Sequence, residues 1–136
     1  MTLPIAAQEL LHTFSTASSW EQTMRLLMQA ATTLAPLTAT ELTEVNRIHG
    51  CESQVWLVAT LQVDHCWYFR AYSEARIVSG LLAVLLARIN GLTSNEISQV
   101  ELFDWFKQLK LTKQLSSSRR DGLTAIWQRI TTIINA

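Results

Sequence analysis

Neither sign of charge is in surplus in this 136-residue sequence, and cysteine is scarce. Lysine plus arginine and aspartate plus glutamate number 11 each, so the formal net charge is zero. A protein that neutralises nucleic-acid phosphates carries a basic surplus, so we expect no nucleic-acid partner. The two cysteines, Cys51 and Cys66, are too few for a disulfide framework. Each is expected to be a free thiol in a reducing compartment.

The sequence also lacks a long uninterrupted apolar run. Its most apolar stretch, residues 77–89, contains Ser79, Gly80 and Arg88 and is shorter than the roughly 18 residues that suggest a membrane span. The start, Met1-Thr2-Leu3-Pro4, lacks the basic segment and apolar segment of a secretory signal. We therefore expect a cytoplasmic protein that does not associate with a membrane.

The sequence does contain enough hydrophobic material for one core. Hydrophobic residues make up 49% of the chain and charged residues 16%, a composition well away from that of disordered proteins. A chain of this length fits one domain and is short for two. We expect residues 1–136 to form a single domain.

Apolar residues at helical spacing predict helices near both ends of the chain. A short helix is expected around residues 10–14, and a second begins after Ser19, which forms a capping-box pattern with Gln22. Residues 37–47 show no clear period and are expected to form a connecting loop. Ser118 is expected to cap a final helix whose apolar stripe consists of Leu123, Ile126, Trp127, Ile130 and Ile134.

The middle of the chain changes to a strand-like period. Apolar residues alternate over residues 55–63, Asp64-His65 is a plausible turn, and residues 66–72 form a second candidate strand antiparallel to the first. Ser73 is expected to cap the apolar helix that follows, with Glu74 in its first turn. The pattern predicts an α+β fold: a small antiparallel sheet of two or three strands packed against several helices.

Cys51 follows a glycine at the entrance to the first long strand. Gly50 can adopt backbone angles closed to other residues, so the loop can turn sharply and present Cys51 at its tip. On these grounds alone two interpretations stay open. Cys51 is either a reactive thiol or a small buried hydrophobic residue, which is the commoner role of a free cysteine.

Three blocks, in order along the chain, carry a family resemblance. They are Gly50-Cys51-Glu52-Ser53-Gln54-Val55-Trp56, Ser73-Glu74-Ala75-Arg76-Ile77-Val78-Ser79-Gly80-Leu81-Leu82-Ala83-Val84, and Leu115-Ser116-Ser117-Ser118-Arg119-Arg120-Asp121-Gly122-Leu123. They resemble the Gly-Cys-x-Ser-x-Val-Trp, Ser-Asp/Glu-x-x-Ile-Val-x-Gly-Leu-x-Ala-Val and Leu-x-x-Ser-Arg-x-x-Gly-Leu patterns of the SufE and CsdE sulfur acceptors. The likeness extends to Trp20-Glu21 and so covers nearly the whole chain.

The resemblance implies a SufE-like fold and a function in sulfur transfer. Cys51 would accept sulfur as a persulfide from a pyridoxal-phosphate cysteine desulfurase, SufS-like or CsdA-like, and stimulate that enzyme. The sulfur would pass on to an iron-sulfur cluster scaffold or another acceptor. The chain would be a covalent carrier rather than an enzyme, with no cofactor and no metal of its own. The sequence blocks do not separate the SufE branch from the CsdE branch.

Three further side chains are candidate site residues, Arg119 and Glu74 from the resemblance and His49 from its position beside the cysteine. The attacking group must be a thiolate, and Arg119, at the matching position of the third block, is expected to favour that anion or to contact the partner. Glu74 is a candidate partner contact, although a place in the first turn of a helix would explain it equally well. His49 lies beside the cysteine and is a candidate for assisting proton transfer or contacting the partner. Family members usually carry an acidic residue where this chain has Tyr72.

A zinc-binding or scaffold module is an alternative hypothesis. His49, Cys51, His65 and Cys66 would supply imidazole and thiolate ligands of the kind that zinc accepts. Their spacing matches no ordinary finger or ribbon.

A cysteine-nucleophile hydrolase is a second alternative. Cys51 would then need activation by His12, His49 or His65 and an orienting third group. Under the carrier hypothesis, by contrast, the Cys51 loop is expected to shelter the thiol and open on docking, with Val55 and Trp56 as candidate walls of the shelter.

Overall fold

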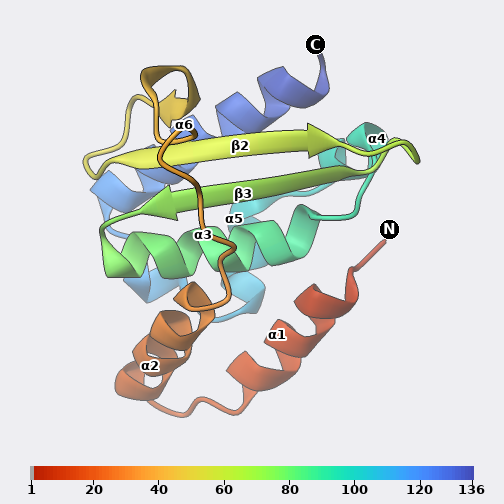
Figure 1. The fold of residues 1–136 in the computed structure, drawn as a ribbon. Helices are drawn as coiled ribbons and strands as arrows, with labels where there is room; N and C mark the ends of the chain where they lie inside the picture. Colours follow the sequence, from red (N-terminus) through yellow and green to blue (C-terminus); the bar gives the residue numbers. More distant parts are fainter. Residues whose placement is uncertain (1) are drawn as a thin grey trace.

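The fold is described for residues 2–136 by a computed structural model. Over this range the chain forms six α-helices, two short 3-10 helices and one three-stranded sheet. In chain order the elements are α1 (Ile5–Ser15), α2 (Trp20–Ala31), η1 (Glu44–Asn46), β1 (Arg47–Ile48), β2 (Val55–Leu61), β3 (Trp67–Ser73), α3 (Arg76–Ile89), α4 (Ser94–Ser98), α5 (Leu102–Gln108), η2 (Thr112–Gln114) and α6 (Ser117–Ile134). The predicted α+β class, with a small antiparallel sheet against several helices, is confirmed (Figure 1).

The sheet has the order β1-β2-β3, and both pairs are antiparallel. Opposite residues share a face, so the pairs Leu57 with Ala71 and Val55 with Ser73 place buried side chains toward the helices. The opposite face carries Trp56, which forms a tilted aromatic pair with Tyr72. The alternation predicted over residues 55–63 is confirmed at Val55 and Leu57, which are buried, but β2 ends at Leu61, and Leu61 and Val63 are exposed. β1 was missed because it has two residues, too few for a visible period.

Helix α3 is the centre of the core. It runs beneath the hairpin in Figure 1, between the sheet and the α1–α2 pair. Nine of its 14 residues are buried, including Leu82, Val84 and Ile89. A helix that packs against other elements on nearly every side, as α3 does, has apolar residues on nearly every side. Within residues 2–136, none of the helices combines the length and apolarity needed to cross a bilayer.

The structure corrects two predicted helix starts. Helix α3 begins at Arg76, with Ala75 at the N-cap position, so Ser73 does not cap it and Glu74 lies outside its first turn. Ser73 ends β3, and its hydroxyl accepts a hydrogen bond from the Ala75 N–H. Helix α6 begins earlier than expected, because Ser116 accepts from the Arg119 N–H and is its N-cap, and Ser118 lies inside the helix. Ser116 and Ser118 are both suitable N-cap residues for α6, and only the backbone geometry decides which of them caps the helix.

The connection from α2 to β1 crosses the outer face of the sheet (Figure 1). Arg70 of β3 holds it there: its guanidinium donates to both carboxylate oxygens of Glu41, at 2.9 Å for Oε1, and to the Pro36 carbonyl at 3.2 Å. The hydrogen bonds from Arg70 hold the pKa of the Glu41 carboxyl down at about 2. This ion pair ties the middle of the long connection to β3.

Glu41 is expected to contribute acid-sensitive stability. Its pKa is lower in the folded state than in the unfolded chain, so the stabilisation is fully present above the unfolded pKa and is lost as pH falls through the folded pKa. Glu41→Gln should therefore lower the urea midpoint clearly at pH 6 and by a smaller amount at pH 3. Denaturation curves of both proteins at the two pH values measure this. An equal difference at both pH values would contradict the assignment.

Candidate functional site

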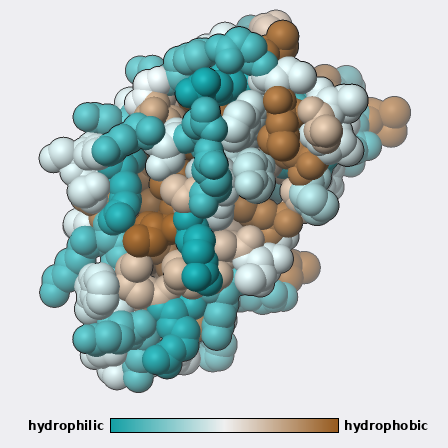
Figure 2. Space-filling model, turned by 60° about the vertical axis from the view of Figure 1, so that its left-hand side comes forward, coloured by the Kyte–Doolittle hydropathy of each residue, from teal (hydrophilic) through white to brown (hydrophobic). Residues whose placement is uncertain are grey.

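One end of the molecule gathers the loop before β2 and the N-terminal ends of α3 and α6. These three segments lie together at the left of Figure 1 and border a pocket of about 540 Å³. Apolar walls come from Met28, Ile77, Leu81, Leu123 and Ile126, and polar ones include Arg76 and Arg119. Figure 2, which brings this end forward, shows apolar surface set among polar side chains. Cys51 lines the same pocket.

Cys51 is half-buried against the first turns of α6. Its Sγ lies 3.4 Å from the Gly122 carbonyl, to which the thiol donates. Cys51 packs directly on Gly122, and a Cβ built on that glycine would lie 3.5 Å from the sulfur, at ordinary contact distance. Gly50, just before the cysteine, has φ +97, in the left-handed region that favours glycine. The sharp turn predicted for Gly50 is therefore present, and it directs the cysteine inward toward α6.

Burial raises the pKa of the Cys51 thiol above its ordinary value. The charged thiolate is disfavoured because it loses solvation where the sulfur is half-buried against α6. At neutral pH the free protein therefore holds Cys51 chiefly as the protonated thiol, which is a poor nucleophile. Any reaction at this sulfur needs either a change in its surroundings or a nearby positive charge.

Arg119 lies on the wall of the Cys51 pocket, as does Arg76. The Arg119 guanidinium donates to the Gln114 carbonyl at 2.9 Å, so it is fixed at the pocket by the backbone of η2. Its backbone N–H is held by the Ser116 cap. The structure thus brings Arg119 to the same cavity as Cys51, with the guanidinium directed to a carbonyl rather than to the sulfur.

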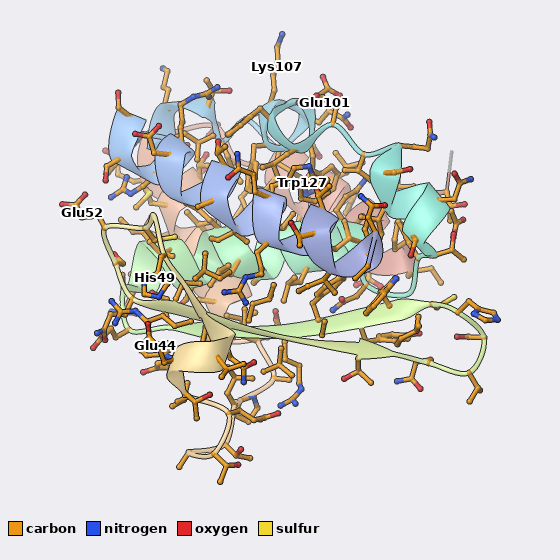
Figure 3. All side chains as sticks on the ribbon, turned by 90° about the horizontal axis from the view of Figure 1, so that it is seen from above. Glu44, His49, Glu52, Glu101, Lys107 and Trp127 are labelled. Atoms are coloured by element: carbon orange, nitrogen blue, oxygen red, sulfur yellow. The ribbon has the colours of Figure 1, made fainter. Side chains whose placement is uncertain are left out.

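His49 and Glu74 lie outside the walls of this pocket. The imidazole Nε2 of His49 lies 2.6 Å from Glu44 Oε1, and both side chains are exposed. Figure 3 shows this pair on the η1 side of the loop. Glu74 is exposed in the turn between β3 and α3. Both residues are on the surface near the site, where a docking protein could reach them.

The walls of the pocket differ from the predicted shelter. Val55 is fully buried and faces the core from the start of β2, while Trp56 lies on the outer face of the sheet against Tyr72. Neither lines the Cys51 pocket, whose apolar walls come from α2, α3 and α6. The prediction was wrong because Val55 and Trp56 are the first residues of β2. Side chains in a strand alternate between the two faces of the sheet, and neither of these two faces the pocket.

The four residues of the zinc hypothesis do not come together. His49 and Cys51 precede β2, whereas His65 and Cys66 follow it, and a strand of seven residues separates the two pairs by roughly 20 Å. Between residues 2 and 136 there is no cluster of three or more histidine, cysteine or carboxylate side chains suited to a metal ion. None of the three histidines proposed as bases for a hydrolase lines the Cys51 pocket.

Sequence reasoning missed the side chains that hold the Cys51 loop. The Ser118 hydroxyl donates to the Glu52 carboxylate, which joins the loop to the first turn of α6. Arg129, three turns further along α6, donates to the carbonyls of Val45 and Arg47 at 3.4 and 2.7 Å. These contacts join residues 66 to 84 positions apart, so no local spacing could reveal them.

Comparison with known proteins gives three consistent findings. The family model "SufE: Fe-S metabolism associated domain" matches residues 8–134. An uncharacterized SufE-like protein of Haemophilus influenzae is 36% identical over 114 residues, covering 84% of this chain and 90% of that protein. The solution structure of a hypothetical protein from Thermus thermophilus has a TM-score of 0.77 and 16% identity, over 98% of this chain and 96% of that one.

Proposed function

Because this chain belongs to the SufE family, whose domain is associated with Fe-S metabolism, we propose that it carries sulfur as a persulfide on Cys51. The observation that supports this most directly is the position of Cys51. Its half-buried thiol lines a pocket with both apolar and polar walls, next to the exposed Glu52 of the same loop. A carrier needs this combination because the bound sulfur must be accessible to a partner yet protected from small thiols and oxidants.

The transfer step is a thiol exchange in which no net oxidation occurs. Cys51 first loses its proton, and its thiolate then attacks the outer sulfur of a persulfide on the donor. The sulfur–sulfur bond of the donor breaks, the donor cysteine leaves as a thiolate, and a new sulfur–sulfur bond forms on Cys51. The donor is a cysteine desulfurase, SufS-like or CsdA-like, whose turnover rises as its persulfide is removed.

The loaded carrier then delivers its sulfur to an iron-sulfur scaffold or another acceptor. The acceptor thiolate attacks the outer sulfur of the Cys51 persulfide in the same chemistry, and the Cys51 thiolate is the leaving group. The cycle fits a reducing compartment such as the cytoplasm and a single carrier domain over residues 1–136. The chain acts as a covalent carrier, so one covalent event per chain is expected and not steady hydrolysis.

The Cys51 thiol of the free protein is a poor nucleophile because it is protonated, so docking must change its surroundings. Burial raises the pKa of Cys51, and the Gly122 carbonyl accepts from the protonated thiol, which favours the protonated form. We propose that the Cys51 loop opens when the donor docks. When the loop is open, the Cys51 thiol is exposed to solvent or to charged groups of the partner. A larger fraction of it is then ionised to the thiolate. Glu74 and His49, exposed around the site, are proposed partner contacts.

The experiment that tests the function is a loading assay. The protein is mixed with a cysteine desulfurase and cysteine, and its peptides are mapped by mass spectrometry. One additional sulfur on the Cys51 peptide, together with faster desulfurase turnover, is the expected result. Absence of any modification on that peptide in the presence of an active desulfurase contradicts the proposal.

Arg119→Ala is expected to lower the rate of sulfur transfer roughly tenfold, the factor that about 1.4 kcal/mol of lost transition-state stabilisation gives. Arg119 is one of two cationic side chains on the wall of the pocket. Its guanidinium is directed to the Gln114 carbonyl in the free protein, so we propose that it favours the Cys51 thiolate only once the loop has opened. Single-turnover loading of Cys51 measures the rate. The matched control is Arg120→Ala, since Arg120 stacks over Phe103 at 4.2 Å, outside the pocket. Unchanged loading in Arg119→Ala would remove this residue from the mechanism.

A further inference from the structure

The Cys51 loop is tied to α6 on both sides. Before the cysteine, Arg129 donates to the backbone carbonyls of Val45 and Arg47. After the cysteine, the Glu52 carboxylate accepts from the Ser118 hydroxyl. Figure 3 shows Glu52 at the outer end of the loop, where α6 begins. The loop that lines the pocket is therefore attached to α6 on each side of Cys51, in addition to the hydrogen bond from the Cys51 thiol to the Gly122 carbonyl.

The two attachments differ in strength. On the first side a half-buried arginine makes two bonds to backbone carbonyls, and β1 adds the pairing of the buried Ile48 with Val55. On the second side one side-chain hydrogen bond joins two residues at the surface. A partly exposed contact of this kind opens at lower free energy than a segment held by backbone pairing. Opening is therefore expected from the Glu52 side, with Gly50 at φ +97 between the two attachments.

Electrostatics favours the second attachment, the hydrogen bond between Ser118 and Glu52. The first turn of α6 contains no acidic residue of its own and carries Arg119 and Arg120. A helix N-terminus bears partial positive charge and is stabilised by a nearby carboxylate. Glu52 supplies that negative charge from the loop, and Ser118 positions it by a charge-assisted hydrogen bond. The closed loop and the start of α6 thus stabilise each other.

We propose that Glu52 and Ser118 form a latch that holds the Cys51 loop closed and sets the fraction of time for which the thiol is accessible. Neither residue takes part in the sulfur chemistry, so both are positioning residues. The biological meaning of the latch rests on the proposed function: a docking donor must separate Glu52 from Ser118 before its persulfide can reach Cys51. The latch itself is a property of the free protein and can be tested without a donor.

The test is the rate at which iodoacetamide alkylates Cys51 in the free, reduced protein, followed by mass spectrometry of the Cys51 peptide. Ser118→Ala removes the hydrogen bond, and Glu52→Gln removes the negative charge that strengthens it. Each should raise the alkylation rate roughly threefold to tenfold, the range that the net contribution of one ordinary hydrogen bond gives. Ser118→Thr keeps the hydroxyl and should restore the slow rate. The matched controls, Ser117→Ala and Asp121→Asn, alter exposed side chains of the same helix end and should leave it unchanged.

Two further results decide whether the two residues act as one unit. The double variant Glu52→Gln with Ser118→Ala should react no faster than the faster single variant, because one contact cannot be removed twice. All variants should keep the wild-type melting temperature within a few degrees, so a faster rate reports local opening. Wild-type rates in both single variants of the folded protein would overturn the latch, as would two effects that multiply in the double variant.

The alkylation assay separates the latch from the proposed function. If the latch variants react faster but no sulfur is ever found on Cys51 with a desulfurase, the latch holds and the carrier function fails. If wild-type protein loads sulfur but Glu52→Gln alkylates at the wild-type rate, the function holds and the latch fails. If both hold, Glu52→Gln should also load sulfur at lower donor concentrations than the wild type.

Discussion

Cys51→Ser is expected to abolish persulfide loading completely while leaving the fold intact. The hydroxyl of serine cannot accept a sulfane sulfur, and it is similar in size to the thiol that it replaces. It can also donate to the Gly122 carbonyl as the thiol does. Loading with a desulfurase and cysteine, read as the mass of one added sulfur atom, should therefore fall from near stoichiometric to undetectable. Desulfurase stimulation should disappear with it.

The second cysteine provides the matched control. Cys66 lies beyond the far end of β2 and is also half-buried, and its pKa is raised by burial and then by the nearby Asp64 carboxylate. Cys66→Ser should load sulfur as the wild type does. A Cys51→Ser protein that still gains one sulfur atom, mapped to Cys66, would show that the wrong thiol has been assigned. Sulfur on neither thiol in the wild type would remove the carrier function.

Gly80→Ala is expected to destabilise the protein by about 1–3 kcal/mol, the range for overpacking a close-packed core. A Cβ on Gly80 would lie 2.5 Å from the Leu27 carbonyl oxygen and 2.7 Å from Leu27 Cγ. A backbone carbonyl cannot move aside alone, so α2 would have to shift away from α3. Alanine has an intrinsic helix advantage of about 1 kcal/mol over glycine, and the overlap outweighs it. Urea denaturation measures the effect.

The same substitution at the other helical glycine should have a different sign. A Cβ on Gly122 in α6 would lie 3.5 Å from Cys51 Sγ, which is an ordinary contact. Gly122→Ala should therefore be neutral or stabilise the fold by up to about 1 kcal/mol through helix propensity. Gly80→Ala with wild-type stability would mean that α2 does not approach α3 as closely as described.

Several features of the fold could be predicted because their causes are local. The strand after Cys51, the apolar helix after the hairpin and the Ser19 N-cap of α2 depend on neighbours in sequence, and the structure contains all three. The errors arose where two local signals compete. Ser116 and Ser118 are both good N-cap residues, and the polar contact of Ser118 with Glu52 uses the hydroxyl that was expected to cap.

The sequence by itself determined the family, the α+β class and the cysteine to examine. The signals for these, which are the motif spacing, the hydrophobic period and the glycine before Cys51, depend only on residues that are close in sequence. Only the tertiary structure decided what surrounds that cysteine. Gly122 and Ser118 contact the loop from a helix some 70 residues later, and Arg119 of the same helix lines the pocket. Burial raises the pKa of Cys51, and burial is set by how distant segments pack, which no pattern along the chain records.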